Sequence, residues 1–168
     1  MDDRPVRIAV IGAGDATSED VACAESVGRL VGERGAVLIC GGLGGVMEAA
    51  ARGCTRAGGL TIGILPGREA SGANPWIRLP LATAMGEGRN VLVVRSAEAV
   101  IAVGGSWGTL SEIALARKIG RPVILLGMPP AEGLDVTLAD DAEQAVAWAL
   151  QEARDMREPA DTGGFLGT

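Results

Sequence analysis

The chain alternates short apolar runs with longer segments of helical period. The runs are apolar at nearly every position, and those predicted as strands are Val6–Ile11, Ala36–Cys40, Leu60–Leu65, Glu98–Val103 and Val123–Leu126. A strand that is apolar on both faces has to be buried on both faces, as in a parallel sheet that helices cover. The sequence therefore predicts a Rossmann-like, doubly wound α/β fold with a mainly parallel sheet and helices on both faces.

The remaining elements follow from weaker patterns. They are an edge strand at Ile77–Leu81, a helix from about Glu87, a short strand at Asp135–Thr137, and a helix that Asp140 and Asp141 open. A chain of 168 residues is long enough to bury one full core. We expect a single ligand-binding domain over residues 1–157 and a mobile C-terminal tail over residues 158–168, which have little to bury.

Three of the predicted strands end in glycine turns that lead into helices, at Gly12–Gly14, Gly41–Gly45 and Gly104–Gly108. A helix N-terminus presents free N–H groups and the positive end of the helix dipole, which attract phosphate. One such turn is explained as well by a backbone that needs glycine. Three turns at one edge of a parallel sheet predict an anion site instead.

The first turn matches the dinucleotide-binding fingerprint incompletely, because Thr17 stands where the third glycine belongs. Thr17 or Ser18 can cap the helix that follows. The predicted ligand-binding residues come from all three turns and their surroundings: Gly12, Gly14, Gly42, Gly44, Gly45, Met47, Arg89, Gly104, Gly105, Ser106, Gly108 and Thr109.

Two charged residues near these turns ask for an explanation. The helix predicted from Glu87 places Arg89 in its first turn, where a cation opposes the helix dipole. Glu112 lies about one turn into the helix after the third glycine turn, whose buried face we expect to include Leu110, Ile113 and Ala114. Both residues are candidates for the site. The alternatives are a solvated surface position for Arg89 and simple complementation of the dipole by Glu112.

Composition excludes several functions. The chain has no histidine, which rules out a histidine base, and its three cysteines form no Cys-x-x-Cys pair, so we predict no metal site. A net charge of −6 and few aromatic residues argue against a nucleic-acid partner. No apolar stretch has the length of a membrane span and no signal peptide is visible, so we expect a cytoplasmic protein without a membrane partner.

Two motifs resemble the signatures of the Lonely Guy (SLOG) superfamily, formerly called lysine decarboxylase-like. Gly41–Met47 followed by Gly63–Pro66 resembles the first signature, and Gly104–Glu112 resembles the second, Pro-Gly-Gly-x-Gly-Thr-x-x-Glu. Asn74-Pro75 and Gly88-Arg89-Asn90 look most like the branch that includes molybdenum cofactor carrier proteins. The resemblance extends over about Val6 to Gly127.

The superfamily's enzymes cleave cytokinin nucleoside monophosphates into base and ribose phosphate, which implies catalytic roles for Arg89 and Glu112. This chain departs from them: Val103 replaces the signature proline, and Gly86–Asn90 keeps the arginine but lacks the enzymes' histidine and lysine. The resemblance therefore favours a binding or carrier protein for a phosphate-bearing small molecule, either molybdenum cofactor or a nucleotide, with no required cofactor. A nucleoside 5′-monophosphate phosphoribohydrolase is the alternative, and nucleotide sensing is a third.

The resemblance also implies dimers. Ala114-Leu115-Ala116 is an apolar, weakly charged segment that we expect to offer contact surface. We therefore expect a homodimer or a tetramer built from dimers.

Overall fold

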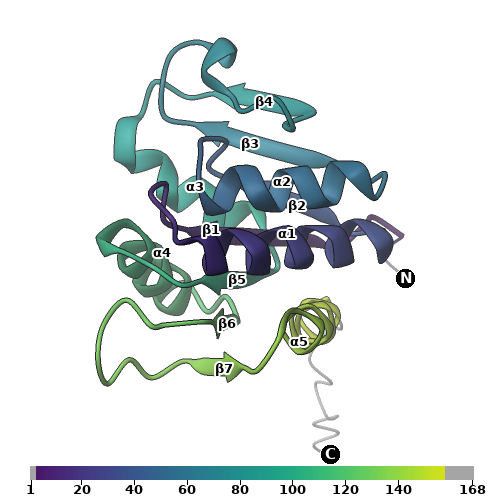
Figure 1. Ribbon diagram of the computed structural model, residues 1–168, viewed down its shortest axis with the longest axis vertical. Helices are drawn as coiled ribbons and strands as arrows, with labels where there is room; N and C mark the ends of the chain where they lie inside the picture. Colours follow the sequence, from purple (N-terminus) through teal and green to yellow (C-terminus); the bar gives the residue numbers. More distant parts are fainter. Residues whose placement is uncertain (1–2, 158–168) are drawn as a thin grey trace, which may run out of the picture.

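The computed structural model describes residues 3–157, whose strands form one seven-stranded sheet. All neighbouring strands pair in parallel, in the order β4-β3-β2-β1-β5-β6-β7 (Figure 1). The strands are β1 (Arg7–Gly12), β2 (Val37–Cys40), β3 (Thr61–Leu65), β4 (Leu79–Ala82), β5 (Ala99–Val103), β6 (Val123–Leu126) and β7 (Thr137–Ala139). The predicted fold class is confirmed. The expected tail at 158–168 lies outside the described residues.

Helices cover both faces of this sheet. One face carries α1 (Ser18–Glu33), α2 (Val46–Arg56) and α5 (Ala142–Asp155), and the other carries α3 (Asn90–Ser96) and α4 (Trp107–Lys118). Short 3-10 segments η1 (Ala70–Gly72) and η2 (Gly86–Arg89) precede β4 and α3. Figure 1 shows α1 and α2 side by side in front of the sheet. No helix within residues 3–157 has the length and apolar character needed to span a bilayer.

The core consists of two layers because successive strand residues point to opposite faces. In β5, Ile101 and Val103 pack with α1, α2 and α5, whereas Val100 and Ala102 pack with α3 and α4. Every residue of β5 is buried. This explains why the central strands are continuously apolar in the sequence.

Glycines allow α1 and α2 to pack backbone against backbone. A Cβ at Gly28 would lie 1.9 Å from the carbonyl oxygen of Ala50, and a Cβ at Gly53 would lie 2.1 Å from that of Glu25. Any side chain at either position would push the helices apart. The contact fixes where both helices begin, and so fixes the turns that precede them.

Two edge strands begin two residues later than predicted. β4 starts at Leu79 rather than Ile77, because the backbone N–H groups of Trp76 and Ile77 donate to the side chain and carbonyl of Asn74 and form a turn. β7 starts at Thr137 rather than Asp135, after a tight turn in which Val136 donates to Leu134. β4 is an edge strand, as predicted.

The buried face of α4 differs from the predicted one. The helix buries Thr109, Glu112, Ile113 and Ala116, whereas Ala114 is exposed. The prediction selected the most apolar stripe, but the sheet and α3 cover a stripe that includes two polar residues. Because Ala116 is in the core, the segment from Ala114 to Ala116 is not the continuous contact surface that the sequence suggested.

A buried carboxylate joins three separate segments at the amino edge of the sheet. Glu98 accepts hydrogen bonds from the backbone N–H of Arg7 at 2.8 Å and from Nε and Nη2 of Arg157 at 2.7 and 2.9 Å. Burial alone raises the pKa of Glu98, but the hydrogen bonds from Arg157 and Arg7 outweigh it, and the pKa is lowered. The start of β1, the start of β5 and the chain after α5 therefore depend on one ionised group.

We predict that Glu98→Gln lowers the free energy of unfolding by about 3 kcal/mol at pH 7, because it breaks a buried ion pair. A lowered pKa means that the stabilisation is fully present above the unfolded-state pKa of about 4.3 and is lost as the pH falls through the folded-state pKa. The difference from the unmodified protein in urea denaturation should therefore shrink at pH 3. Glu132→Gln, at an exposed position, is the control. Equal stabilities at pH 7 would contradict the prediction.

Candidate functional site

The three glycine turns meet at the carboxyl edge of the sheet. They follow β1, β2 and β5, which are neighbours in the order β2-β1-β5. From β1 the chain proceeds outward to β2, and from β5 it proceeds outward on the other side to β6, so β1 and β5 flank a topological switch point. Ligands of such sheets bind at this point. We call Gly12–Gly14, Gly41–Gly45 and Gly104–Gly108 together the turn cluster.

The first and second turns of the cluster touch each other. The backbone N–H of Val46 donates to the carbonyl of Ala13 at 3.0 Å, which joins the second turn to the first. Gly45 has a φ of 64°, and a Cβ there would lie 2.3 Å from the same carbonyl oxygen. A Cβ at Gly12 would lie 2.7 Å from the carbonyl oxygen of Val103, at the end of β5. The first two turns are thus packed together, and the third follows the strand that pairs with Gly12.

The helices that follow the second and third turns begin without side-chain caps. The residue before α2 is Gly45, which has no side chain, and the residue before α4 is Ser106, whose hydroxyl does not cap the helix. In contrast, Thr17 caps α1 and Asp141 caps α5. Uncapped N–H groups need water or a ligand as acceptor. The starts of α2 and α4 therefore lack the side-chain acceptor that Thr17 provides at the start of α1, and anion binding at the second and third turns stays a prediction.

Arg89 is buried beside the second turn. It ends η2, is 8% exposed, and its Nη2 donates to the carbonyl of Gly41 at 3.4 Å. Its Nη1 donates to the side chain of Asn90, and its Nε is buried without a described partner. The alternative of a solvated surface arginine is wrong. A buried cation with an unused donor is suited to bind an anion.

Glu112 is buried on the face of α4 that packs against α3 and the sheet. It is 8% exposed, and no residue within 3–157 donates a hydrogen bond to its carboxyl group or forms an ion pair with it. Burial raises the pKa of Glu112 to about 7, although the positive charge of Arg89 lowers it in part. Glu112 is the sixth residue of α4 and not in its first turn. Complementation of the helix dipole therefore does not explain it.

Other predicted residues lie around this pair. A Cβ at Gly41 would lie 2.7 Å from both Met47 Sδ and Arg89 Nη2, which places Met47 beside the guanidinium group. Thr109 is 1% exposed and its hydroxyl is buried without a described partner. The turn from Gly105 to Gly108 is exposed. The structure thus brings the predicted residues of the second and third turns together with Arg89 and Glu112.

Sequence reasoning missed two residues that hold the cluster in place. The Asn74 side chain donates to the carbonyl of Leu43 at 2.8 Å, and its backbone N–H donates to the carbonyl of Gly42 at 2.9 Å. The Asp20 carboxylate packs against Gly104, where a Cβ would lie 2.6 Å from its Oδ1. The Asn74-Pro75 pair was the available signal for the first. Nothing in the sequence indicated the second, because the contact joins α1 to a turn 84 residues away.

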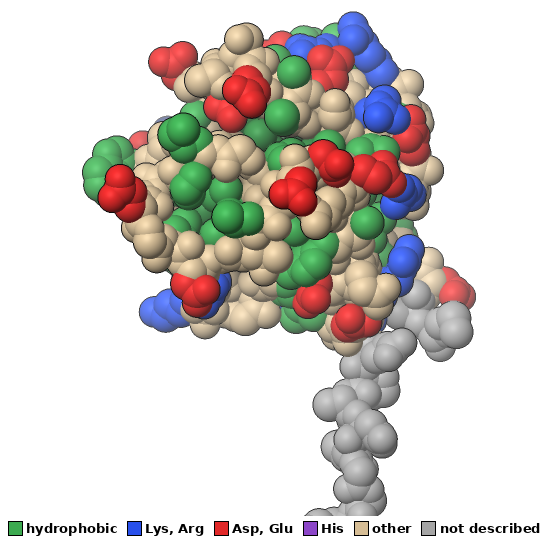
Figure 2. Space-filling view, turned by 60° about the horizontal axis from the view of Figure 1, so that its bottom comes forward, with side chains coloured by type: hydrophobic (Ala, Val, Ile, Leu, Met, Phe, Trp, Pro, Cys, Tyr) green, Lys and Arg blue, Asp and Glu red, His purple; other side chains and the backbone are tan. Residues whose placement is uncertain are grey.

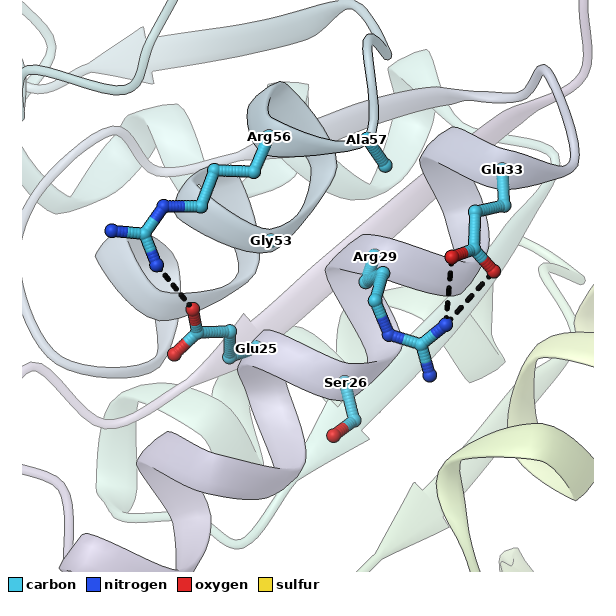
Figure 3. Close-up of a pocket in the computed structure, with 7 residues that line it drawn as sticks. All are labelled: Glu25, Ser26, Arg29, Glu33, Gly53, Arg56 and Ala57. Atoms are coloured by element: carbon cyan, nitrogen blue, oxygen red, sulfur yellow. Dashed lines mark hydrogen bonds and ion pairs between the residues drawn. The ribbon is translucent and has the colours of Figure 1, made fainter.

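A cavity lies away from the turn cluster, and its charged side chains do not leave a free cation for an anion. This cavity of about 390 Å³ lies between the second half of α1 and the end of α2, and Figure 3 shows the residues that line it. Its charged side chains are already paired, Arg56 with Glu25 at 3.1 Å and Arg29 with Glu33 at 2.7 Å. On the face in Figure 2, acidic and apolar side chains are interspersed and the basic ones lie mostly at the margins. Within residues 3–157 no group of three or more Cys, Asp or Glu is placed to hold a metal ion.

Comparison with known proteins shows which family this chain matches and which solved structures it resembles. Residues 5–158 match the model of the SLOG cluster4 family. An uncharacterized protein of Archaeoglobus fulgidus is 44% identical over 148 residues, which are 88% of this chain and 97% of that protein. The structure of the molybdenum cofactor binding protein from the phototrophic bacterium Rippkaea orientalis superposes with a TM-score of 0.83 at 36% identity, over 89% of this chain and 98% of that one. The molybdenum cofactor carrier protein from Chlamydomonas reinhardtii gives 0.81 at 33% identity, over 90% and 99%.

We predict that Glu112 titrates near pH 7, as measured by NMR of side-chain-labelled glutamate, and that Arg89→Ala raises this pKa further. Because the folded-state pKa exceeds the unfolded-state value, Glu112 lowers stability as the pH rises from about 4.3 to about 7. Glu112→Gln should therefore raise the free energy of unfolding at pH 8 by up to about 3 kcal/mol. A Glu112 titration near 4.5 would mean that the carboxyl group is solvated or paired.

Proposed function

The chain belongs to the SLOG cluster4 family, and we propose that it binds and carries molybdenum cofactor, holding the phosphate of this ligand at the turn cluster. The observation that carries the proposal is the match to two molybdenum cofactor proteins, each above 30% identity and nearly end to end. Proteins that share more than 30% identity over nearly their whole length are expected to bind the same class of ligand. The geometry of the site has to support that expectation, because a shared fold alone does not establish a function.

The geometry supports a phosphate-bearing ligand at two places. The N–H groups from Gly105 to Thr109 at the uncapped start of α4 would bind the phosphate, with Ser106 and Gly108 alongside. The unused Nε of Arg89 would donate a charge-assisted hydrogen bond to the same ligand. The remaining predicted residues, Gly12, Gly14, Gly42, Gly44, Gly45 and Met47, would line the ligand from the first and second turns.

Phosphoribohydrolase activity is the second candidate, and one observation favours it. A buried carboxyl group with a pKa near 7 beside an arginine is suited to acid–base chemistry at an N-glycosidic bond. The departures of Val103 and of Gly86–Asn90 from the enzyme signatures favour binding over hydrolysis. Nucleotide sensing needs only the binding function and would use the same turns.

Self-association is part of the proposal. The edge strand β4 exposes Leu79 and Leu81 at 45% and 44%, and an exposed apolar edge is a surface for pairing. We expect a homodimer or a tetramer in solution. Light scattering should report at least twice the monomer mass at micromolar concentration. A monomer under these conditions would contradict this expectation.

The carrier function predicts that molybdenum cofactor copurifies with the protein from cells that synthesise it, as measured by native mass spectrometry and metal analysis. Gly108→Val should abolish copurification. A Cβ at Gly108 meets no atom within 4 Å, so the side chain would fit the fold but would cover the N–H groups of α4. Gly72→Val, at an equally open position in η1, is the matched control and should retain the ligand.

Incubation with nucleoside monophosphates distinguishes the two candidates. The carrier should release no free base. Release of base that disappears in Glu112→Gln would overturn the carrier proposal in favour of the hydrolase. Retention of the ligand by Gly108→Val would show that the phosphate lies elsewhere.

A further inference from the structure

Glu112 carries a property that phosphate binding does not explain. A carboxylate near a phosphate repels it, and a buried carboxyl group without a partner is costly to the fold. Yet Glu112 is 8% exposed, has no hydrogen-bond partner within residues 3–157, and shares its helix with the third glycine turn. No side chain within residues 3–157 therefore competes with a ligand for the carboxyl oxygens of Glu112.

The position of Glu112 limits which part of a ligand it can reach. It lies five residues into α4 from Trp107, about 7.5 Å along the helix axis. Helical side chains lean toward the N-terminus, so its carboxyl group covers the preceding turn. Thr109, one turn earlier on the same face, contacts the position of a Cβ at Gly105 at 3.0 Å. A ligand whose phosphate lies at the start of α4 can therefore place a second group at Glu112.

The chemistry of that second group follows from what a carboxylate accepts. Two oxygens with parallel lone pairs match two neighbouring N–H donors, as in a bidentate pair with guanidinium. We propose that Glu112 recognises the edge of a planar heterocycle that offers such a donor pair, namely the 2-amino-4-oxopyrimidine edge of a pterin, while the phosphate of the same molecule lies at the start of α4. The assignment rests on the proposed carrier function, because the molybdenum cofactor is itself a pterin phosphate.

Proton exchange accompanies this recognition. The groups that act on Glu112 are the guanidinium of Arg89 at the end of η2 and the thiol of Cys40 at the end of β2, which is buried and whose pKa is raised to about 12. Burial raises the pKa of Glu112 in the free protein to about 7. The donor pair binds the carboxylate form, so binding releases a proton and the affinity rises with pH until Glu112 is ionised.

The experiment compares two probes that differ in one group. The 6-hydroxymethylpterin monophosphate offers an N–H and an NH₂ on neighbouring atoms, whereas 6-hydroxymethyllumazine monophosphate has a carbonyl in place of the NH₂. Fluorescence titration at pH 8 should give at least about tenfold tighter binding of the pterin, because the lumazine oxygen would face the carboxylate. Between pH 6 and pH 8 the affinity for the pterin should rise about tenfold.

Variants separate the role of Glu112 from that of the phosphate site. Glu112→Gln should bind both probes with similar affinity and should lose the part of the pH dependence that phosphate ionisation does not cause. Glu152→Gln, on α5 across the sheet, should behave as the unmodified protein. Circular dichroism and thermal unfolding establish that each variant is folded.

Two further outcomes would overturn the proposals for this protein. Equal affinity of the unmodified protein for the two probes, with both lost in Gly108→Val, overturns the role of Glu112 and leaves the carrier function intact. Failure of both probes to bind, together with the absence of copurified cofactor, overturns the carrier function and this inference with it. Neither probe contains an N-glycosidic bond, so hydrolysis cannot mimic either result.

Discussion

The close approach of β1 and β5 is the contact on which the site depends. Gly12 pairs with Val103, and a Cβ on Gly12 would lie 2.7 Å from the carbonyl oxygen of Val103. This pairing places the turns after β1, β2 and β5 at one edge of the sheet. Without this pairing, the uncapped starts of α2 and α4 would be separate helix ends. The attraction of a single helix end for an anion is too weak to select one ligand. The sheet topology thus converts ordinary helix termini into one site.

The electrostatics of the candidate site oppose the stability of the fold. Arg89 and Glu112 are both buried, and Glu112 has neither a hydrogen bond nor an ion pair within residues 3–157. The price is a carboxyl group with a pKa near 7. The Glu98 cluster at the opposite edge shows what the same chain does with a structural carboxylate: two arginines hold it ionised and its pKa is lowered. The two glutamates therefore differ in environment: Glu98 is paired and its pKa is lowered, whereas Glu112 has no such partner and its pKa is raised.

The same pair of residues serves both candidate functions, and the neighbouring positions distinguish them. A hydrolase and a carrier both need an anion site and both can use Arg89. Only the hydrolase needs Glu112 to exchange a proton with a reacting group during turnover. In a carrier, the carboxyl group of Glu112 would contribute to ligand recognition and not to a reaction. Val103 replaces the proline of the enzyme signature, and Gly86–Asn90 keeps the arginine but lacks the histidine and lysine of the enzymes. The groups for binding an anion are therefore kept, while groups that hydrolysis would use are missing.

The pattern of residues along the chain predicted the fold class, the positions of the three glycine turns and the candidacy of Arg89 and Glu112. It could do so because continuous apolar runs and glycines act locally, through burial and backbone freedom. Only the tertiary structure decided which face of α4 is buried, that Asn74 and Asp20 hold the turns, and that the starts of α2 and α4 are uncapped while Thr17 caps α1. Burial of Glu112, and so its raised pKa, depends on residues from α3 and the sheet that are distant in sequence. Such contacts have no local periodicity, and a pattern along the chain cannot report them.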